Sequence, residues 1–258
     1  MRNIAQPIVA AQLPFILRGV WPLSSQVLST TVQWFEFFRT VHDMHDIALM
    51  KEIIQNYSSL IIRTYSFVRF TIIKPDLLDQ ISDLMPRDGD FLDLGCGFGL
   101  FPIYYGLKDR ERHITGIDKN KNRIREARAV AKKFNLHNLK FINKDLMDGL
   151  FSGTYDVIYT FDLLHHIPNK VSENLMRHIY NRLRKGGTLI IKDVTVEPRW
   201  KLWFTYILDK IMTKNEPLHY KHHNEVALFL EGLGFKVKVQ KISDILPYPH
   251  VLFVCEKQ

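Results

Sequence analysis

A glycine cluster between two acids is the first place in this chain where residue types and spacing could do chemistry. The apolar segment Phe91–Leu94 runs into the G-x-G-x-G sequence Gly95–Gly99, with Asp93 two residues before its first glycine. Glycines after a strand let the backbone turn tightly and approach a ligand closely. Asp118 ends the next apolar segment, and an acid there can accept hydrogen bonds from both hydroxyls of a ribose. The cluster therefore predicts a nucleoside site.

The charge of the cluster indicates which nucleoside. A dinucleotide fingerprint places its third glycine one residue later, where this chain has Leu100. The Asp93 carboxylate would repel a pyrophosphate, but it would attract a ligand that carries an ammonium and a sulfonium. We therefore expect a positively charged nucleoside rather than NAD. A NAD(P) oxidoreductase is the alternative, and it predicts NADH binding.

Two adjacent histidines form the second candidate site. His165 and His166 follow Phe161 and Asp162, shortly after a predicted strand. Histidine has an ordinary pKa near 6.5, so either side chain could take a proton from a hydroxyl or a carbon acid. The alternative is a histidine at a helix start that only packs and hydrogen-bonds. Adjacent histidines point in different directions, so we expect no metal between them and Asp162 or Asp193.

Alternating strands and helices must position these residues. Such alternation is typical of a doubly wound, mostly parallel sheet. A short connection with Pro247 and Pro249 requires the last two strands to pair antiparallel, which gives an α/β sheet of seven strands. The pair Gly186-Gly187 is expected to end the preceding helix. Strands are predicted at 90–94, 113–117, 139–143, 156–160, 188–194, 235–242 and 250–256, and helices at 100–108, 120–134 and 171–184, with a short turn near 146–150.

Helical segments surround this core. Residues 1–85 are predicted to form an N-terminal helical cover, with helices at 47–57 and 60–84 and a kink at Pro75, and residues 86–258 to form the core. A further helix at 198–213 carries a strongly apolar aromatic face, which includes Trp200 and Trp203. We expect a lid-like element at about 197–220, or a helix that lies on a membrane surface through its Trp and nearby Lys and Arg residues.

These segments resemble the class I S-adenosylmethionine (SAM)-dependent methyltransferases over residues 86–258. Asp93–Gly99 resembles the first motif of the family, and Ile117-Asp118 resembles its ribose acid. Lys144–Leu146 is similar to its adenine-contacting segment, and Leu183–Leu189 is similar to its turn into the fifth strand. The antiparallel end of the sheet is also typical of this family. The resemblance is specific for the cofactor and unspecific for the acceptor.

The resemblance implies a role for each matching position. Gly95 and Gly97, with Cys96 between them, would lie against the methionine part of SAM, and Asp93 near its amino group. Asp118 would hold the ribose, Asp145 and Leu146 would contact adenine, and Phe161 would lie near the cofactor. Where the family often has an apolar residue against adenine, this chain has Lys119, so another side chain would cover that face. Arg69 could reach the methionine carboxylate or form a structural ion pair.

The acceptor is expected to be hydrophobic. An Asn/Asp-Pro-Pro-Tyr/Phe sequence, which would mark methylation of a base or glutamine amino group, is absent after the fourth strand. The aromatic cover elements favour methyl transfer to an oxygen or carbon, less readily a nitrogen, of a small hydrophobic or lipid-like molecule. His166 or His165 would be the general base, although an acceptor that is already nucleophilic needs none.

Composition sets the remaining expectations. The 258 residues are 46% hydrophobic and 24% charged, with a net charge of +8, which excludes a disordered or collagen-like chain. Two distant cysteines offer neither a disulfide framework nor a metal spacing, so we expect a cytoplasmic protein, with peripheral membrane contact as an option. A basic stripe along Lys119–Lys133 supports an RNA methyltransferase as an alternative, although nucleic acid is not the expected partner. A non-catalytic SAM-binding subunit is the other alternative.

Overall fold

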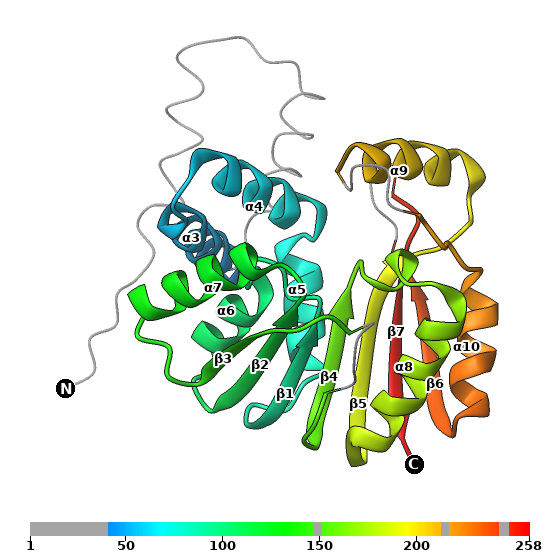
Figure 1. The fold of residues 1–258 in the computed structure, drawn as a ribbon. Coiled ribbons are helices and arrows are strands. Elements are labelled where there is room, and N and C mark those ends of the chain that lie inside the picture. Colours follow the sequence, from blue (N-terminus) through cyan, green and yellow to red (C-terminus); the bar gives the residue numbers. More distant parts are fainter. Residues whose placement is uncertain (1–40, 147–150, 213–216, 243–247) are drawn as a thin grey trace, which may run out of the picture. The chain divides into compact units, whose positions relative to one another are not determined.

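One seven-stranded sheet organises the chain (Figure 1), in the order β3-β2-β1-β4-β5-β7-β6. Neighbouring strands pair parallel except β7, which is antiparallel to both β5 and β6. The predicted α/β sheet of seven strands with an antiparallel last strand is therefore confirmed. The strands are β1 (Gly89–Leu94), β2 (Arg112–Asp118), β3 (Leu139–Asn143), β4 (Tyr155–Phe161), β5 (Leu183–Val194), β6 (Phe235–Lys241) and β7 (His250–Lys257).

The order of the strands reverses between β1 and β4. The chain leaves β1 toward β2 and β3 on one side, and leaves β4 toward β5 on the other. In open α/β sheets, ligands bind in the crevice beyond the carboxyl ends of the strands at such a reversal. The glycine cluster follows β1 and the two histidines follow β4, so both candidate sites lie at this crevice.

This computed structural model describes residues 41–146, 151–212, 217–242 and 248–258. The chain divides into two compact units, residues 1–48 and residues 49–258. The predicted helical cover before residue 41, the predicted turn after Leu146 and the connection 243–247 lie outside the described residues. In the described part, none of the helices combines the length and the hydropathy that crossing a bilayer requires.

Helices cover both faces of the sheet. One apolar core joins α5 (Pro75–Asp83), α6 (Leu100–Lys108) and α7 (Lys121–Lys133) to the sheet, and a second core joins α8 (Asn169–Arg182) and α10 (His223–Gly232) to its other face. The periodicity of α7 explains its docking, because Ile124, Ala127, Val130 and Ala131 are buried. The remaining helices are α3 (Val41–Asn56), α4 (Leu60–Ile72) and α9 (Arg199–Met212), with a 3₁₀ turn, η1, at Leu164–His166.

The helices expected before the sheet divide at Pro75. The Ser59 side chain accepts a hydrogen bond from the Ile62 backbone and caps α4, whereas Pro75 is the first residue of α5. The first compact unit ends at residue 48, and residues 49–85 belong to the same compact unit as the sheet. The physical reason is burial: Phe70 of α4 and Leu78 of α5 share one core with the sheet.

The expectation for the glycine pair was wrong. Helix α8 ends at Arg182, before the glycine pair, and Gly186-Gly187 lies within β5, between the residues where its pairing with β4 shifts register. The Gly187 backbone packs so closely against that of Arg184 that a Cβ would come within 2.8 Å of its carbonyl oxygen. Arg128, within the basic stripe of α7, donates hydrogen bonds to the Phe141 carbonyl of β3.

Candidate active site

The turn after β1 is built from left-handed glycines. The backbone N–H groups of Gly95 and Cys96 donate to the Ile117 carbonyl at 2.8 and 3.0 Å, which ties the turn to the end of β2. Gly97 has a φ of +55°, and apart from its two chain neighbours no atom of the described residues lies within 4 Å of the position that a Cβ would occupy there. This conformation favours glycine, and the open space beside Gly97 is available to a ligand.

The acid before this turn has an unpaired oxygen. Asp93 is only 2% exposed, and its Oδ2 has no hydrogen-bond partner among the described residues. Burial raises the pKa of Asp93 well above its usual range, and the Asp118 charge raises it further, whereas Arg69 lowers it. A buried, unsatisfied carboxylate oxygen is costly, and an ammonium group would satisfy it. The site therefore fits the amino group that the resemblance assigned to Asp93.

The second acid is already oriented by the backbone. Asp118 Oδ2 accepts from the Gly97 N–H at 3.0 Å, and Oδ1 accepts from the Asn120 N–H at 2.8 Å. A carboxylate oxygen can accept more than one hydrogen bond, so each oxygen can still accept from a hydroxyl. This carboxylate is held at the glycine turn, as a ribose-binding acid requires.

The other predicted cofactor residues gather at the same edge in different settings. Lys119 is exposed, and Asp145 and Leu146 are half-buried just after β3. Cys96 is buried, and a Cβ added to Gly116 would come within 2.9 Å of its sulfur, so its side chain packs inside the fold. Phe161 is also buried, edge-on to the Phe101 ring at 5.0 Å. These roles stay predictions, and for Cys96 only the backbone is placed to meet a ligand.

Arg69 forms an ion pair at the end of β4. Its Nη1 lies 2.6 Å from Asp162 Oδ2, and its guanidinium lies over the Phe101 ring at 5.7 Å from the centroid. Asp162 also accepts from the fully buried Lys192 of β5 at 2.7 Å. The two cations therefore hold one carboxylate from different elements, and a contact of Arg69 with a methionine carboxylate stays a prediction.

His250 completes this buried ion network. Its Nε2 lies 2.9 Å from Lys192 Nζ and 3.8 Å from Asp162 Oδ1. Burial raises the pKa of Asp162, but Lys192, Arg69 and His250 outweigh it and hold that pKa well below its usual value. Sequence reasoning missed Lys192 and His250. The available signal was a lysine inside the apolar strand Leu189–Val194, since a buried charge needs a partner.

Asp193, the next residue of β5, makes its contacts on the opposite face of the sheet from Lys192. Asp193 Oδ2 accepts from the Leu164 N–H at 2.8 Å, and Oδ1 contacts His165 Nδ1. Because side chains alternate along a strand, Lys192 and Asp193 hold the segment after β4 from its two sides. His165 is buried, stacks on Tyr220 with centroids 5.5 Å apart, and is fixed in orientation by Asp193.

His166 differs from its neighbour in its surroundings. It is partly exposed, and its Nδ1 has no hydrogen-bond partner among the described residues. Burial, with the adjacent His165, lowers the pKa of His166 to about 4, while the carboxylates of Asp193 and Asp162 oppose this shift. His166 is therefore a neutral imidazole near pH 7 with an unpaired ring nitrogen, and its ring centroid lies 4.0 Å from that of His165.

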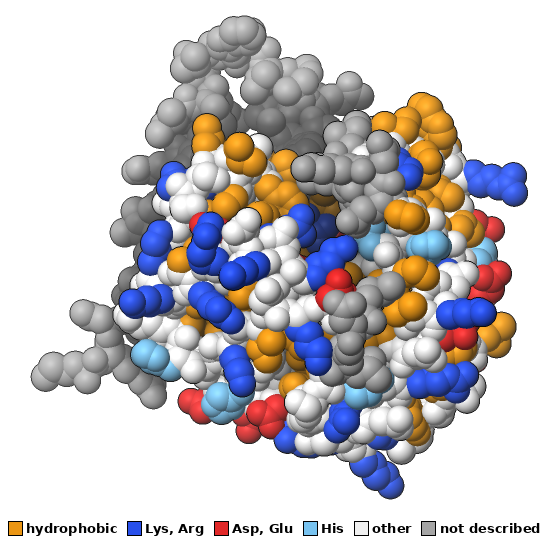
Figure 2. All heavy atoms as spheres, in the orientation of Figure 1, with side chains coloured by type: hydrophobic (Ala, Val, Ile, Leu, Met, Phe, Trp, Pro, Cys, Tyr) orange, Lys and Arg blue, Asp and Glu red, His pale blue; other side chains and the backbone are white. Residues whose placement is uncertain are grey.

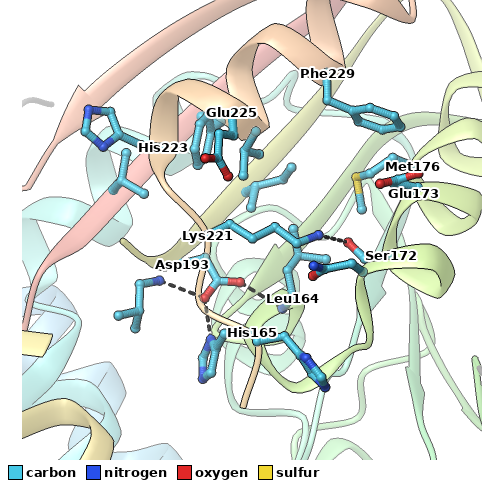
Figure 3. A pocket seen from close by; sticks show the side chains of 17 residues that line it. Leu164, His165, Ser172, Glu173, Met176, Asp193, Lys221, His223, Glu225 and Phe229 are labelled. Carbon is cyan, nitrogen blue, oxygen red and sulfur yellow. Dashed lines mark hydrogen bonds and ion pairs between the residues drawn. The ribbon is translucent and has the colours of Figure 1, made fainter. Parts of the chain in front are cut away.

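A cavity of about 290 Å³ lies on the α8 and α10 side of β5 (Figure 3). His165 and Asp193 form part of its wall, and Lys221 extends across it to donate to Ser172 Oγ at 3.0 Å. Apolar side chains, among them Met176 and Phe229, share the rest of the lining with polar ones such as Glu173 and Glu225. The His165–Asp193 pair is thus part of the cavity lining.

One side-chain cluster has the composition of a metal site. Single ligand atoms of Glu197, His222 and His223 all lie within 4.8 Å of one another. However, His222 Nδ1 accepts from the Asn224 N–H at 3.2 Å and caps α10. A neutral ring that accepts at Nδ1 carries its proton on Nε2, which is then not a metal ligand. We therefore assign no metal to this cluster.

Comparisons with known proteins agree with the geometry. A family model described as a methyltransferase domain matches residues 67–239. The chain is 28% identical to (S)-coclaurine N-methyltransferase of Thalictrum flavum subsp. glaucum over 42% of this chain and 30% of that protein. It is 29% identical to ubiquinone biosynthesis O-methyltransferase of Marinobacter nauticus over 49% of this chain and 53% of that protein. The chain thus spans less than two thirds of the length of these relatives.

A solved structure shares the fold. Magnesium protoporphyrin IX methyltransferase from Synechocystis PCC 6803, solved with bound SAH, superposes with a TM-score of 0.59 at 16% identity. The superposition covers 89% of this chain and 94% of that one. The similarity therefore extends through the sheet and its flanking helices.

Proposed function

The chain belongs to the class I SAM-dependent methyltransferases, and from this premise we propose that it transfers a methyl group to an oxygen or carbon of a small hydrophobic or lipid-like molecule. The observation that carries the proposal is the buried, unpaired Asp93 carboxylate beside the open glycine turn. That acid fits a cationic nucleoside and repels the pyrophosphate of a dinucleotide. The rival hypothesis of an NAD(P) oxidoreductase is therefore disfavoured.

Three groups of this chain would hold the cofactor. Asp93 would accept from its ammonium group, the Asp118 oxygens would accept from its ribose hydroxyls, and the open backbone at Gly97 would lie against its methionine part. SAM supplies an electrophilic methyl group on a sulfonium. Asp145 and Leu146 are the residues proposed for the adenine.

His166 would take the proton that the acceptor releases. An amine can attack through its lone pair without losing a proton first, whereas a hydroxyl or carbon acid gains from a base. A base whose pKa is about 4 is weak, so the proposed acceptor is itself acidic, such as a phenol or an enol. The name of the ubiquinone biosynthesis O-methyltransferase is consistent with such an acceptor, whereas that of the coclaurine enzyme points to nitrogen.

Apolar cover elements support a hydrophobic acceptor. Leu60, Ile61 and Phe67 of α4 and Trp200 and Trp203 of α9 are exposed large apolar side chains. Both helices are tied to the strand ends, since Arg69 of α4 bonds Asp162 and α9 begins five residues after β5. An acceptor that approaches this edge would meet an apolar surface.

The RNA alternative receives less support. Part of the basic stripe is used inside the fold: Arg128 bonds the β3 backbone, and Arg123 lies over the Phe98 ring at 5.5 Å from its centroid. Fewer cations are then left for phosphates than the sequence suggested. A non-catalytic SAM-binding subunit is an outcome of the experiment below.

The first experiment is calorimetric titration with S-adenosylhomocysteine, with NADH as the control ligand. We expect binding of S-adenosylhomocysteine that Asp118→Ala abolishes, and no binding of NADH. Transfer of labelled methyl groups from SAM into lipid extracts then tests catalysis, with His166→Asn as the matched variant. Binding without transfer by the native chain would support the non-catalytic subunit, and tighter binding of NADH would refute the cofactor.

A further inference from the structure

Exposed apolar side chains concentrate on two helices. Large apolar side chains are exposed at Leu60, Ile61, Phe67 and Val68 of α4 and at Trp200, Trp203, Tyr206 and Ile207 of α9, eight of the twelve such side chains in the described residues. In Figure 1, α4 and α9 lie at the same end of the sheet, and in Figure 2 apolar side chains gather over α9. This concentration is unlike scattered exposure, and it marks an interaction surface.

The exposed face of α9 follows the helical period. Trp200, Trp203 and Ile207 lie at i, i+3 and i+7, and the two tryptophans are 64% and 68% exposed. On the same helix Thr205 is buried, so the aromatic stripe is turned away from the fold. A helix that only packed on the sheet would bury this stripe instead.

Cations accompany the stripe. Lys201 Nζ lies over the Trp200 ring at 5.5 Å from its centroid, and Lys210 Nζ lies over the Tyr206 ring at 5.7 Å. The sequence of α4 contains no acid and that of α9 contains one, Asp209. Together the two helices carry an excess of positive charge.

We propose that α9, together with the exposed end of α4, docks onto the surface of an anionic lipid bilayer. Tryptophan prefers the interface between headgroups and acyl chains, and Lys side chains extend past apolar groups to reach phosphates. Each cation near an anionic membrane strengthens the attraction, and dissolved salt weakens it. A second copy of this chain fits less well, because protein interfaces are depleted in lysine whereas this surface pairs lysines with aromatic rings.

The position of the surface has a consequence for the reaction, and this consequence rests on the proposed function. The strands end where α4 and α9 begin to cover the fold, so the docked face is also the face of the candidate active site. A lipid-like acceptor could then pass from the bilayer to the site without entering bulk water.

The experiment is co-sedimentation of the full chain with vesicles, one set of phosphatidylcholine and one set that also contains phosphatidylglycerol. We expect binding to the anionic vesicles that decreases with added salt. The variant Trp200→Ser/Trp203→Ser should bind them roughly tenfold or more weakly, since burying a single Trp is worth more than 1.4 kcal/mol. Phe67→Ser/Val68→Ser tests α4 in the same way.

The matched control is Leu228→Ser, which removes an equally exposed apolar side chain, 68% exposed, from α10. It should bind as the native chain does, and all variants should unfold at similar temperatures. The proposal is refuted if native protein does not bind anionic vesicles, or if the tryptophan variant binds them equally well. It is also refuted if those tryptophans instead hold a dimer in solution. The readout needs neither SAM nor an acceptor, so it is independent of the proposed activity.

Discussion

Replacing Lys192 by methionine should destabilise the protein in a way that depends on pH. Methionine keeps the length of the side chain but removes the charge that faces Asp162 at 2.7 Å. Breaking a buried ion pair costs about 3–5 kcal/mol. Because Arg69 remains 2.6 Å from the same carboxylate, we expect a loss near the lower end, about 3 kcal/mol. For a chain of this size that loss lowers the unfolding temperature by roughly 6–12 °C.

The pH dependence identifies the cause. The pKa of Asp162 is held well below its usual value, so its ion pairs stabilise the fold above pH about 4, and this stability is lost as the pH falls further. Burial and Lys192 both lower the pKa of His250. In the variant His250 should protonate more easily and partly replace the missing charge. The His250 effect makes the difference between native and variant protein largest near pH 8 and smaller near pH 5, and the Asp162 effect reduces it further only below pH about 4.

Thermal unfolding at several pH values, followed by circular dichroism, measures this difference. The matched control is Lys185→Met, which removes an exposed lysine from the same strand and should change the unfolding temperature little. A loss equal to that of the control, or a loss that grows on acidification, would show that the ion network does not hold the end of β4.

Three further predictions concern the candidate site. Asp93→Asn removes a buried, unpaired carboxylate whose pKa is raised, and such a carboxylate destabilises the fold as the pH rises. The variant should be more stable than the native protein without ligand by about 1–3 kcal/mol in thermal unfolding, and calorimetry should show S-adenosylhomocysteine binding weakened at least tenfold. Gly97→Ala should lower stability by only about 1–2 kcal/mol yet abolish cofactor binding. Gly99→Ala should destabilise the fold more, because its Cβ would lie 2.7 Å from that of Ala127, and equal effects of the two variants on stability would contradict the assignment of open space at Gly97. If His166 is the base, the rate of methyl transfer should decrease on acidification only toward pH 4, and a decrease centred near pH 6.5 would exclude it.

Much of the fold could be predicted from local pattern. The alternation of apolar strands and amphipathic helices gave every described strand to within a few residues, apart from the start of β5. Pro75 marked the break between α4 and α5, because proline is tolerated in the first turn of a helix but not in its interior. The glycine turn could also be predicted from local pattern, because a left-handed turn favours glycine whatever surrounds it. The acids Asp93 and Asp118 could be predicted with it, because each lies at the end of an apolar strand segment.

The division of the chain into compact units could not be predicted from local pattern. The N-terminal helices look like a separate cover in the sequence, yet residues 49–85 bury apolar side chains in the core of the sheet. Burial depends on which surfaces meet, and an amphipathic helix does not specify its partner. Similarly, the glycine pair after α8 became part of β5 because its backbone packs closely against that of neighbouring segments.

The sequence by itself determined the family, the cofactor edge and the residues that could act there, because those features are encoded by neighbours along the chain. Only the tertiary structure decided how the two histidines differ and how the segment after β4 is held. Arg69 and Lys192 meet at Asp162 from positions 93 and 30 residues away, and Asp193 fixes His165 from 28 residues away. Pairings across such distances follow from packing of the sheet, and packing also sets the burial that determines each pKa.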